Sequence, residues 1–433
     1  MTAASISSEP VASWVPVPDD SPFPLHNLPF GVGRRPDGTV AALVAIGEHA
    51  LDIGAASRQF AGTAAAHGLL DAAGTLNEFA GLGRRAHRAV RDRAAAVLAD
   101  PSMESLLADA LIRLDDVTMC LPVGIGDYVD FYSSLHHATN LGRLFRPGGE
   151  PLLPNWRHLP VGYHGRSGTI VIDRTPVARP AGLRLVDDTP VDAPTTALDF
   201  ESEVGFVCGA ASTPGRRVST ADAEDHLFGL CLVNDWSARD IQSFEYQPLG
   251  PLLGKSFATS MSPWIVTLDA LEPFRVPPPT QDPVVSEYLR TEASTGFDLH
   301  LEVSIQSADM AAQGIDPVVI STTGFADMYW TAAQQIAHLT ANGAHLRPGD
   351  LFASGTVSGP TPGSEGSLIE ITRGGVHTVA LPDGTCRAFL ADGDTVTVRG
   401  WAGSDPLTRI GVGTVTGTII PSPTDDDTTT KEN

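Results

Sequence analysis

The residues of this sequence that are most suited to chemistry are carboxylates placed beside apolar segments. Glu201 and Glu203 lie two positions apart in residues 198–207 (LDFESEVGFV), which predict a strand. In an extended chain both carboxylates point to one side, and the apolar side chains Phe200, Val204 and Phe206 point to the other side, into a core. Two like charges on one face repel each other unless water or a cation neutralises them. The pair therefore indicates either a solvated surface or a divalent cation bound in a cleft.

Two further carboxylates could complete such a cation site. Asp130 lies in a polar block of irregular sequence, and Asp235 follows the apolar run 227–233, which predicts a buried strand. Four carboxylates without His or Cys favour a hard cation, Mg²⁺ or Ca²⁺, over Zn²⁺. The alternative for Asp235 is that it only caps a helix predicted over 236–244.

Three side chains that could stabilise negative charge follow Asp235, namely Arg239, Gln242 and Lys255. If 236–244 is helical, Arg239 lies one turn after Asp235, and an ordinary helix ion pair is the alternative to a catalytic role. Lys255 lies in GPLLGKSFAT (250–259), which is one residue short of the phosphate-loop spacing GxxxxGK[ST], so we reject nucleotide binding. A lysine in such a loop is better suited to polarising an oxyanion or to meeting the carboxylates.

His137 is the candidate general base, because an imidazole titrates near neutral pH and can take a proton from water. Such a base needs an acceptor that orients it. Glu370 is a candidate, since it is a charged residue in an apolar segment that we interpret as a strand, and such a residue needs a partner. A structural role for His137 is the alternative, and the neighbouring His136 leaves the assignment open on spacing alone.

The elements that must position these groups point to a mostly β protein with helices. Residues 1–118 form a separate unit, with a hairpin of strands at 39–46 and 50–53 and helical patterns at 56–66 and 84–100. Residues 119–180 are rich in aromatic, His, Gly and Asn residues and predict irregular chain, which inside a domain is usually functional. Short strands follow, with one clear helix predicted at 328–339. The acidic, Thr-rich residues 422–433 predict a disordered tail.

Composition excludes several classes of function. The chain has 433 residues, of which 42% are hydrophobic and 18% charged, as in a soluble globular protein. The net charge of −23 argues against nucleic acid as a partner. We expect no membrane span and no signal peptide, because no apolar run is long enough for the first and the first ten residues lack the pattern of the second. The four scattered cysteines favour the reducing cytoplasm over a disulfide framework.

Several long motifs resemble one enzyme family. They are GDYVDFYSS with HATN, LPNWRHLPVGYHGR, LDFESEVGFV, VNDWSARDIQSFEYQPLGPLLGKSFATSMSPW, MYWTAAQQ, LRPGDLFASGTVSGP and GSLIE. With them the chain resembles the fumarylacetoacetases, the long form of the fumarylacetoacetate hydrolase superfamily, because shorter members lack the N-terminal domain and the DFYSS block. The resemblance implies an N-terminal SH3-like barrel (1–118) and a mixed β-roll catalytic domain (119–421), assembled as a homodimer.

The resemblance also implies roles for individual residues. Asp130, Glu201, Glu203 and Asp235 would hold a catalytic Ca²⁺ or Mg²⁺, and Lys255 and Thr259 would belong to a second, structural cation-associated position with Asp235. His137 would be the base and Glu370 its partner, while Arg239, Gln242 and Lys255 would stabilise developing negative charge. Contacts to the substrate would come from Tyr132, Arg146, Tyr163, Gln242, Tyr246 and Thr356. One departure is visible, since Leu135-His136 stands where the family carries Arg-Gln, so His136 could tune the base.

The activity implied by the resemblance is metal-dependent hydrolysis of the C–C bond of 4-fumarylacetoacetate, a small diketo-dicarboxylate, to fumarate and acetoacetate. This reaction is the last step of phenylalanine and tyrosine breakdown. The alternative is a decarboxylase, isomerase or acylpyruvate-type hydrolase of the same superfamily that acts on another diketo acid. A non-catalytic binding protein is a third hypothesis, and it is disfavoured because none of the four carboxylates is missing.

Overall fold

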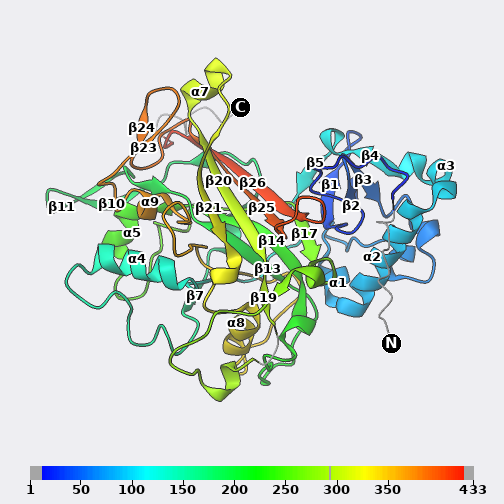
Figure 1. The fold of residues 1–433 in the computed structure, drawn as a ribbon, viewed down its shortest axis with the longest axis horizontal. Coiled ribbons are helices and arrows are strands. Elements are labelled where there is room, and N and C mark those ends of the chain that lie inside the picture. Colours follow the sequence, from blue (N-terminus) through cyan, green and yellow to red (C-terminus); the bar gives the residue numbers. More distant parts are fainter. Residues whose placement is uncertain (1–11, 292–293, 424–433) are drawn as a thin grey trace, which may run out of the picture.

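The computed structural model of the protein describes residues 12–291 and 294–423. A smaller N-terminal part, blue to cyan in Figure 1, lies beside a larger body built mainly of strands. The predicted mostly β class with helices is confirmed. Most of the predicted disordered tail lies outside the described residues. No helix in the described part of the chain is long and apolar enough to cross a membrane.

The N-terminal part contains the predicted hairpin, in which β2 (Val40–Ile46) pairs with β3 (His49–Asp52). The long helix α2 (Arg84–Ala99) also agrees with the sequence, and it ends before Pro101 as predicted. The helix predicted at 56–66 is wrong. This segment forms two 3₁₀ turns, Ser57–Phe60 and Ala64–His67, separated by Gly62, whose φ of +85° is incompatible with a continuous right-handed helix.

The N-terminal strands continue into the sheet of the larger body. Strand β1 (Phe30–Arg34) pairs with β2 on one side and with β17 (Trp264–Thr267) on the other. One apolar cluster therefore includes residues of both parts, for example Phe30 and Phe79 together with Phe228, whose rings contact one another. The predicted domain boundary at 118/119 remains a prediction.

The strands that position the site lie toward the β7 end of a 13-stranded sheet, whose main path runs in the order β4-β3-β2-β1-β17-β14-β13-β22-β6-β7, with β5, β8 and β16 paired beside it. Its remaining strands have the following bounds: β4 Leu111–Arg113, β5 Thr118–Cys120, β6 Tyr128–Phe131, β7 Gly162–His164, β8 Ile170–Ile172, β13 Ser202–Cys208, β14 Leu227–Asp235, β16 Thr259–Met261 and β22 Leu351–Ala353. The strand predicted at 227–233 is thus confirmed as β14, and all nine of its residues are buried.

The strand predicted at 198–207 is interrupted where the chemistry lies. A short strand β12 (Leu198–Asp199) ends before Phe200, and β13 begins only at Ser202. The Asp199 carboxylate accepts hydrogen bonds from the backbone N–H groups of Leu368 and Ile369. The backbone N–H of Glu201 donates to the Asn234 side chain instead of to a neighbouring strand. These contacts interrupt the regular ladder before Ser202, and Glu201 forms only an isolated bridge with Ser367.

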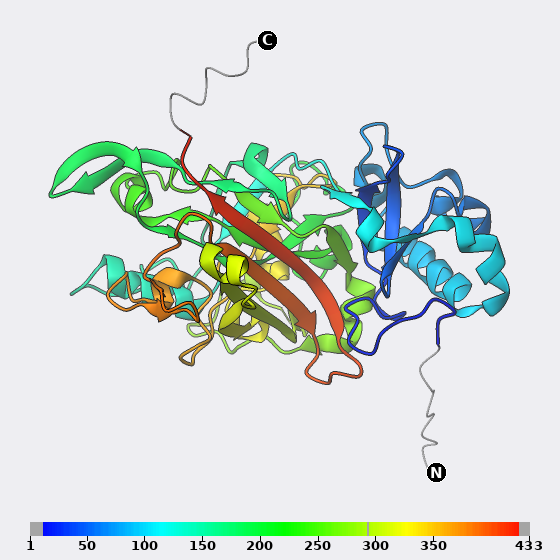
Figure 2. The ribbon, with the colours of Figure 1, turned by 90° about the horizontal axis from the view of Figure 1, so that it is seen from above.

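A second sheet of five strands crosses the body in the order β21-β20-β25-β26-β9, in which β25 and β26 are orange to red in Figure 2 and β20 and β21 are yellow in Figure 1. Its bounds are β9 Val177–Ala178, β20 Leu299–Gln306, β21 Val318–Gly324, β25 Thr395–Ala402 and β26 Ile410–Ile420. Strand β20 alternates strictly between buried and half-buried residues, so one face covers the main apolar core and the other lies outside it. Smaller two-stranded pairs complete the β structure: β10 Ala181–Val186 with β11 Thr189–Pro194, β12 with β15 Ser237–Ala238, β18 Arg275–Val276 with β19 Gly296–Phe297, and β23 Val379–Ala380 with β24 Cys386–Arg387.

The helices have these bounds: α1 Asn77–Gly81, α3 Glu104–Leu107, α4 Leu135–Phe145, α5 Arg239–Glu245, α6 Leu268–Leu271, α7 Ala308–Gln313, α8 Ala332–Leu339 and α9 Leu368–Ile371. The helix predicted at 328–339 exists but begins later, because Thr331 and Gln334 form a capping box that fixes its first turn. The helix predicted at 236–244 begins at Arg239, after the short strand β15.

Helix α4 lies inside the segment that the sequence predicts as irregular. The Ser134 hydroxyl accepts a hydrogen bond from the His137 backbone N–H and so caps the first turn. The helix places Ala138 and Leu141 on its buried face, but Thr and Asn in its middle have low helix propensity. Tertiary packing of this face therefore decides its conformation.

Candidate active site

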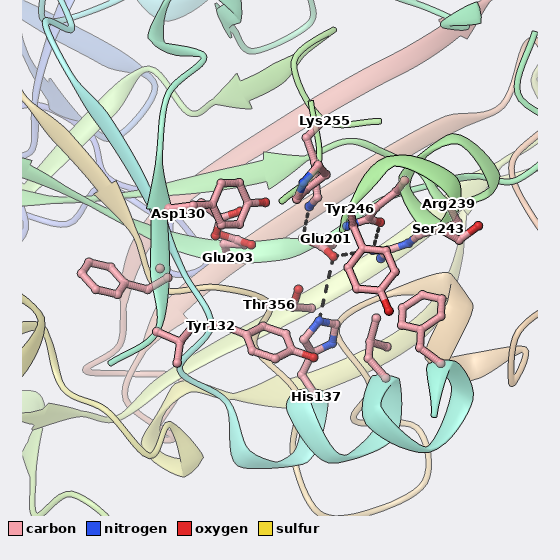
Figure 3. Close-up of a pocket in the computed structure, with 18 of the residues that line it drawn as sticks. Asp130, Tyr132, His137, Glu201, Glu203, Arg239, Ser243, Tyr246, Lys255 and Thr356 are labelled. Carbon is pink, nitrogen blue, oxygen red and sulfur yellow. Dashed lines mark hydrogen bonds and ion pairs between the residues drawn. The ribbon is translucent and has the colours of Figure 1, made fainter. Parts of the chain in front are cut away.

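Four carboxylates, three of them from strands of the larger sheet, meet at one site. Asp130 comes from β6, Glu203 from β13 and Asp235 from the end of β14, and Glu201 lies directly before β13, where it forms an isolated β-bridge with Ser367. All four side chains are buried, and one oxygen of each lies within 4.8 Å of those of the others. Figure 3 shows Asp130, Glu201 and Glu203 directed into the same pocket. The predicted convergence of these residues is therefore observed.

Two basic side chains donate hydrogen bonds to Glu201. Lys255 donates to Glu201 Oε2 over 2.5 Å, and Arg239 donates to Glu201 Oε1 over 2.7 Å. Burial opposes ionisation of this carboxyl, but the two cations prevail and hold the pKa of Glu201 well below its ordinary value.

Asp235 does not cap a helix and does not pair with Arg239, so both alternatives suggested by the sequence are wrong. Its Oδ2 accepts hydrogen bonds from Lys255 over 2.7 Å and from Arg166 over 2.6 Å, and its Oδ1 accepts one from Thr259 over 2.9 Å. Arg239 instead pairs with Asp199 over 2.8 Å, in addition to Glu201. The reason is that β15 separates Asp235 from α5, so the two residues are not one helical turn apart.

Glu203 has the opposite environment. Neither of its buried carboxylate oxygens accepts a hydrogen bond from any described residue. Burial, and then the charges of Asp130, Asp235 and Glu201, raise the pKa of Glu203 well above its ordinary value. Burial similarly raises the pKa of Asp130 to about 6, against the attraction of Arg166. A charged carboxylate that is buried without a partner destabilises the folded protein by several kcal/mol, because the charge has lost its hydration.

These residues fit a hard divalent cation. The donor set consists only of oxygens, it is buried, and the unpartnered oxygens of Glu203 need a positive neighbour. The buried acidic cluster could thus hold a metal ion.

His137 lies beside this cluster, on α4. Its Nδ1 bonds to Glu370 Oε2 over 2.7 Å, and its Nε2 lies 3.9 Å from Glu201 Oε1, so the ring bridges Glu370 and the carboxylate cluster. Both side chains are almost fully buried. The ring of Tyr132 packs against His137 at a centroid distance of 5.3 Å. Figure 3 shows His137 and Tyr132 on the same side of the pocket, across from Lys255.

Glu370 is fixed by several donors. It does not lie in a strand, as the sequence suggests, but in the short helix α9, which begins where Asp199 accepts the N–H groups of its first turn. Ser358 and Ser367 donate to its Oε2, and Asn140 donates to its Oε1. Burial raises the pKa of this carboxyl, but His137 and these hydrogen bonds lower it overall. The carboxylate is therefore ionised at neutral pH and can orient the imidazole.

A pocket of about 220 Å³ opens onto the cluster and the imidazole. Most of the predicted site residues line it: Asp130, Tyr132, His137, Arg146, Tyr163, Glu201, Glu203, Arg239, Gln242, Tyr246, Lys255 and Thr356. Asp235, Thr259 and Glu370 lie behind this lining and contact its members. His136 is adjacent in sequence but does not belong to the described lining.

Besides the Glu203 oxygens, Thr356 Oγ1 and Arg146 Nε are polar atoms of the lining that are buried without a partner among the described residues. The Arg146 guanidinium is otherwise held by the Pro151 carbonyl, to which its Nη2 donates over 2.5 Å. Aromatic rings and Leu141 supply the apolar remainder of the wall. The pocket therefore offers hydrogen-bonding groups, positive charge and apolar surface to a small polar molecule.

Sequence reasoning missed two charged residues of the site. Asp199 pairs with Arg239, and Arg166 donates to both Asp130 and Asp235. A buried acid in the apolar segment 198–207 is a signal that could have indicated Asp199. Arg166 is the last residue of the motif LPNWRHLPVGYHGR in irregular chain, and no apolar segment around it indicates a buried charge.

Comparison with known proteins agrees with this arrangement. The model of the fumarylacetoacetate hydrolase C-terminal family matches residues 128–420, and the fumarylacetoacetase N-terminal family matches 26–122. Among solved structures, a fumarylacetoacetate hydrolase of Exiguobacterium antarcticum is similar in fold, with a TM-score of 0.51 and 18% identity over 91% of this chain and 99% of that chain. Fold and site thus define a hydrolase of the fumarylacetoacetate hydrolase class.

The relatives in sequence are more specific. Fumarylacetoacetase of Homo sapiens is 44% identical over 428 residues, covering 95% of this chain and 99% of the relative. Fumarylacetoacetase of Arabidopsis thaliana is 44% identical over 425 residues, with the same coverage. The chain belongs to the fumarylacetoacetase family, and the predicted family and enzyme class are confirmed.

Proposed function

We propose that the protein hydrolyses 4-fumarylacetoacetate to fumarate and acetoacetate, the last step of phenylalanine and tyrosine breakdown. The observation that supports this most is that a candidate base and a candidate cation site share one pocket. An imidazole oriented by a buried carboxylate lies 3.9 Å from a cluster of four carboxylates. Hydrolysis of a β-diketone needs a base that activates water and positive charge that stabilises an enolate.

The proposed cofactor is Ca²⁺ or Mg²⁺, held by Asp130, Glu201, Glu203 and Asp235. Lys255 and Thr259 would support the site through Asp235, to which both donate. A bound dication supplies Lewis-acid polarisation of the substrate oxygens. The unpartnered oxygens of Glu203 support this proposal.

His137 is the proposed general base. With its Nδ1 proton donated to Glu370, its Nε2 is free to take a proton from water. The water oxygen then forms a bond to the ketone carbonyl carbon of the fumaryl group, which becomes the new carboxyl of fumarate, and the C–C bond from this carbon to the neighbouring methylene carbon breaks. The electron pair of that bond leaves as an enolate, which is protonated to acetoacetate.

Three hydrogen-bond donors across the pocket from His137 could stabilise the departing enolate. Arg239, Gln242 and Lys255 line the pocket, and Arg239 and Lys255 keep their protons because their carboxylate partners raise the pKa of each despite burial. Donors aimed at developing negative charge contribute on the order of 10²–10³-fold each to the rate. Tyr132, Arg146, Tyr163, Tyr246 and Thr356 are the proposed contacts of the substrate, and Arg146 is the one suited to a carboxylate.

A product assay tests the reaction against its alternatives. Purified protein incubated with fumarylacetoacetate should release fumarate and acetoacetate in equal amounts, with loss of the diketone absorbance. Release of CO₂, or an isomer without bond cleavage, would assign the chain to the other reactions of the superfamily. No turnover of any diketo acid, with divalent cation present, would leave the binding hypothesis.

We propose further that the protein is cytoplasmic and forms a homodimer, as the family resemblance implies. All four cysteines lie in the described part of the chain and none forms a disulfide there, which supports a reducing compartment. Apolar side chains are exposed on the β10–β11 hairpin (Leu183, Leu185) and in the loop after α5 (Leu249, Leu252), which supports burial in an interface. Light scattering should give twice the mass of the chain, and a monomer would contradict the assembly.

A further inference from the structure

Arg166 is a cation of the carboxylate cluster that does not face the substrate pocket. Its Nη2 donates to Asp130 Oδ2 over 2.8 Å and to Asp235 Oδ2 over 2.6 Å, and only 5% of its side chain is exposed. It is not among the described residues that line the pocket, whereas Lys255 and Arg239 are. Its charge therefore acts on the carboxylates and not on a bound substrate.

The guanidinium of Arg166 is held in place from both sides. Its central carbon lies 5.0 Å from the ring centroid of Tyr128 and 5.0 Å from that of Tyr163, which are cation–π distances. The residue also adopts a left-handed backbone with φ of +63°, which is uncommon for a side chain of this size. Two ion pairs, two rings and an unusual backbone fix the position of one positive charge.

The charged side chains in and around the cluster have an excess of negative charge. The carboxylates of the cluster and its immediate partner are Asp130, Asp199, Glu201, Glu203 and Asp235. The cations paired with them are Arg166, Arg239 and Lys255. Five negative charges face three positive charges when all are ionised, so two negative charges remain, and one divalent cation neutralises them. Without Arg166 three would remain.

We infer that Arg166 is a charge-setting residue of the proposed cation site: with the five carboxylates ionised, it sets the net charge of these side chains and their three basic partners at −2 and thereby favours divalent over trivalent ions. This inference rests on the cation site proposed above. The attraction between an ion and the cage grows with the product of their charges, so removing Arg166 helps a trivalent ion more than a divalent ion. A loss of ligand geometry alone would weaken two ions of similar size alike.

The test compares Ca²⁺ with Tb³⁺, which have similar radii and both prefer oxygen ligands. Full-length protein is freed of metal, and the affinity for each ion is measured by competition, with Tb³⁺ luminescence sensitised by nearby aromatic rings. In Arg166→Gln the ratio of Tb³⁺ to Ca²⁺ affinity should rise by on the order of tenfold or more, as expected for one added charge in a partly buried site. In Arg166→Lys, which keeps the charge, the ratio should stay near that of the wild type.

Tyr128→Phe is the matched control. The Tyr128 hydroxyl is buried without a partner among the described residues, so its removal keeps the ring against Arg166 and changes no ion pair. The ratio of Tb³⁺ to Ca²⁺ affinity in Tyr128→Phe should equal that of the wild type. A shift as large as that of Arg166→Gln would contradict the assignment of the effect to the charge of Arg166.

The same comparison can be made in a second variant background, in case Arg166→Gln does not fold. Arg166→Gln removes a positive charge and could leave too much negative charge for the protein to fold. In that case Glu203→Gln is compared with the double variant Glu203→Gln/Arg166→Gln, because both lack one carboxylate charge. The same rise in the ratio is expected within this pair. An unchanged ratio in both backgrounds, or an equal rise in Arg166→Lys, would overturn the inference. Wild-type protein that binds neither ion would instead refute the proposed cation site, and the inference with it.

Discussion

Glu201 and Glu203 are identical side chains two residues apart, and the fold gives them opposite electrostatic environments. Glu201 accepts hydrogen bonds from Lys255 and Arg239, whereas Glu203 accepts none from the described residues. One carboxylate is thus stabilised as an anion by the protein itself, and the other needs a further cation. This difference explains why a cluster that already contains three basic side chains can still attract a metal ion.

At the same scale, His137 can be separated from its neighbour His136 by experiment. His137→Gln should lower kcat by on the order of 10²–10⁴-fold, the usual contribution of a positioned base, because glutamine cannot take a proton from water. Binding of Ca²⁺ should persist, since no proposed ligand is changed. The half-exposed His136 is the matched control, and His136→Gln should keep most of the activity. Comparable losses of activity in both variants would contradict the assignment of the base.

Single residues of the site were predictable where a charge stands in apolar sequence. Glu201, Glu203 and Glu370 stand out for this reason, and the structure buries all of them. The pairing of the charges was not predictable, because it depends on contacts between residues far apart in sequence. Arg239 bonds to Asp199, forty positions away, and not to Asp235.

At the scale of elements, the position of Arg146 depends on how α4 packs against the loop that follows it. A Cβ atom on Gly142 would lie 1.8 Å from the Pro151 carbonyl oxygen and 2.8 Å from Arg146 Nη2. Only glycine lets the loop approach the helix so closely, and this approach positions Arg146 at the pocket.

Gly142→Ala should therefore move the helix or the loop. We expect a loss of about 1–3 kcal/mol in the free energy of unfolding, the usual cost of overpacking, together with an increased KM because Arg146 shifts. Denaturant unfolding and steady-state kinetics measure the two effects. Gly149→Ala, where the nearest atom to a Cβ is 3.7 Å away, is the control in the same loop. Equal KM values in the two variants would show that the close approach does not position Arg146.

Helix α2 contains a buried imidazole that should make stability depend on pH. His87 is 1% exposed, lies against the rings of Phe79 and Phe228, and donates from Nε2 toward the carbonyls of Phe79 and Ala80. Burial lowers the pKa of His87, although the two carbonyls oppose this effect. Below the ordinary pKa of 6.5 the unfolded chain binds a proton that the folded chain does not, so stability falls as the pH falls.

This pH dependence can be measured with a matched pair of variants. The free energy of unfolding should decrease below pH 6.5, by at most about 1.4 kcal/mol per pH unit for this one group. His87→Gln keeps a donor and cannot titrate, so the slope between pH 5 and 6.5 should become smaller by this amount. His67→Gln, at an exposed position, should leave the slope unchanged. An unaltered slope in His87→Gln would contradict the buried, neutral imidazole.

The elements themselves were predicted in part. The apolar run of β14 and the amphipathic pattern of α2 identify these two elements because burial determines both patterns. Helix α4 could not be recognised, since Thr and Asn in its middle have low helix propensity and the elements that it packs against, such as α9, come from elsewhere in the chain. Glu370 was placed in a strand for a related reason: a four-residue helix has no periodicity that a pattern could reveal.

At the scale of the whole molecule, the site lies where separate segments of the chain are brought together by one sheet. The order β14-β13-β22-β6 places Asp235, Glu203 and Asp130 on strands that are at most three positions apart, although they span more than 100 residues of sequence. The N-terminal part joins the same sheet through β1 and β17 and shares one of its apolar clusters. Sequence patterns predicted the mostly β class, but not this continuity, because strand pairing over long distances has no local signal.

The central claim is that four buried carboxylates bind one dication and that hydrolysis depends on it. The most direct measurement is the rate of absorbance loss of fumarylacetoacetate, with protein that has been freed of metal and then titrated with Ca²⁺ or Mg²⁺. The account predicts no turnover without the cation, and full recovery when one ion per chain is bound. Undiminished turnover by metal-free protein, or recovery in a variant whose Asp130 and Glu203 are both replaced by alanine, would contradict it.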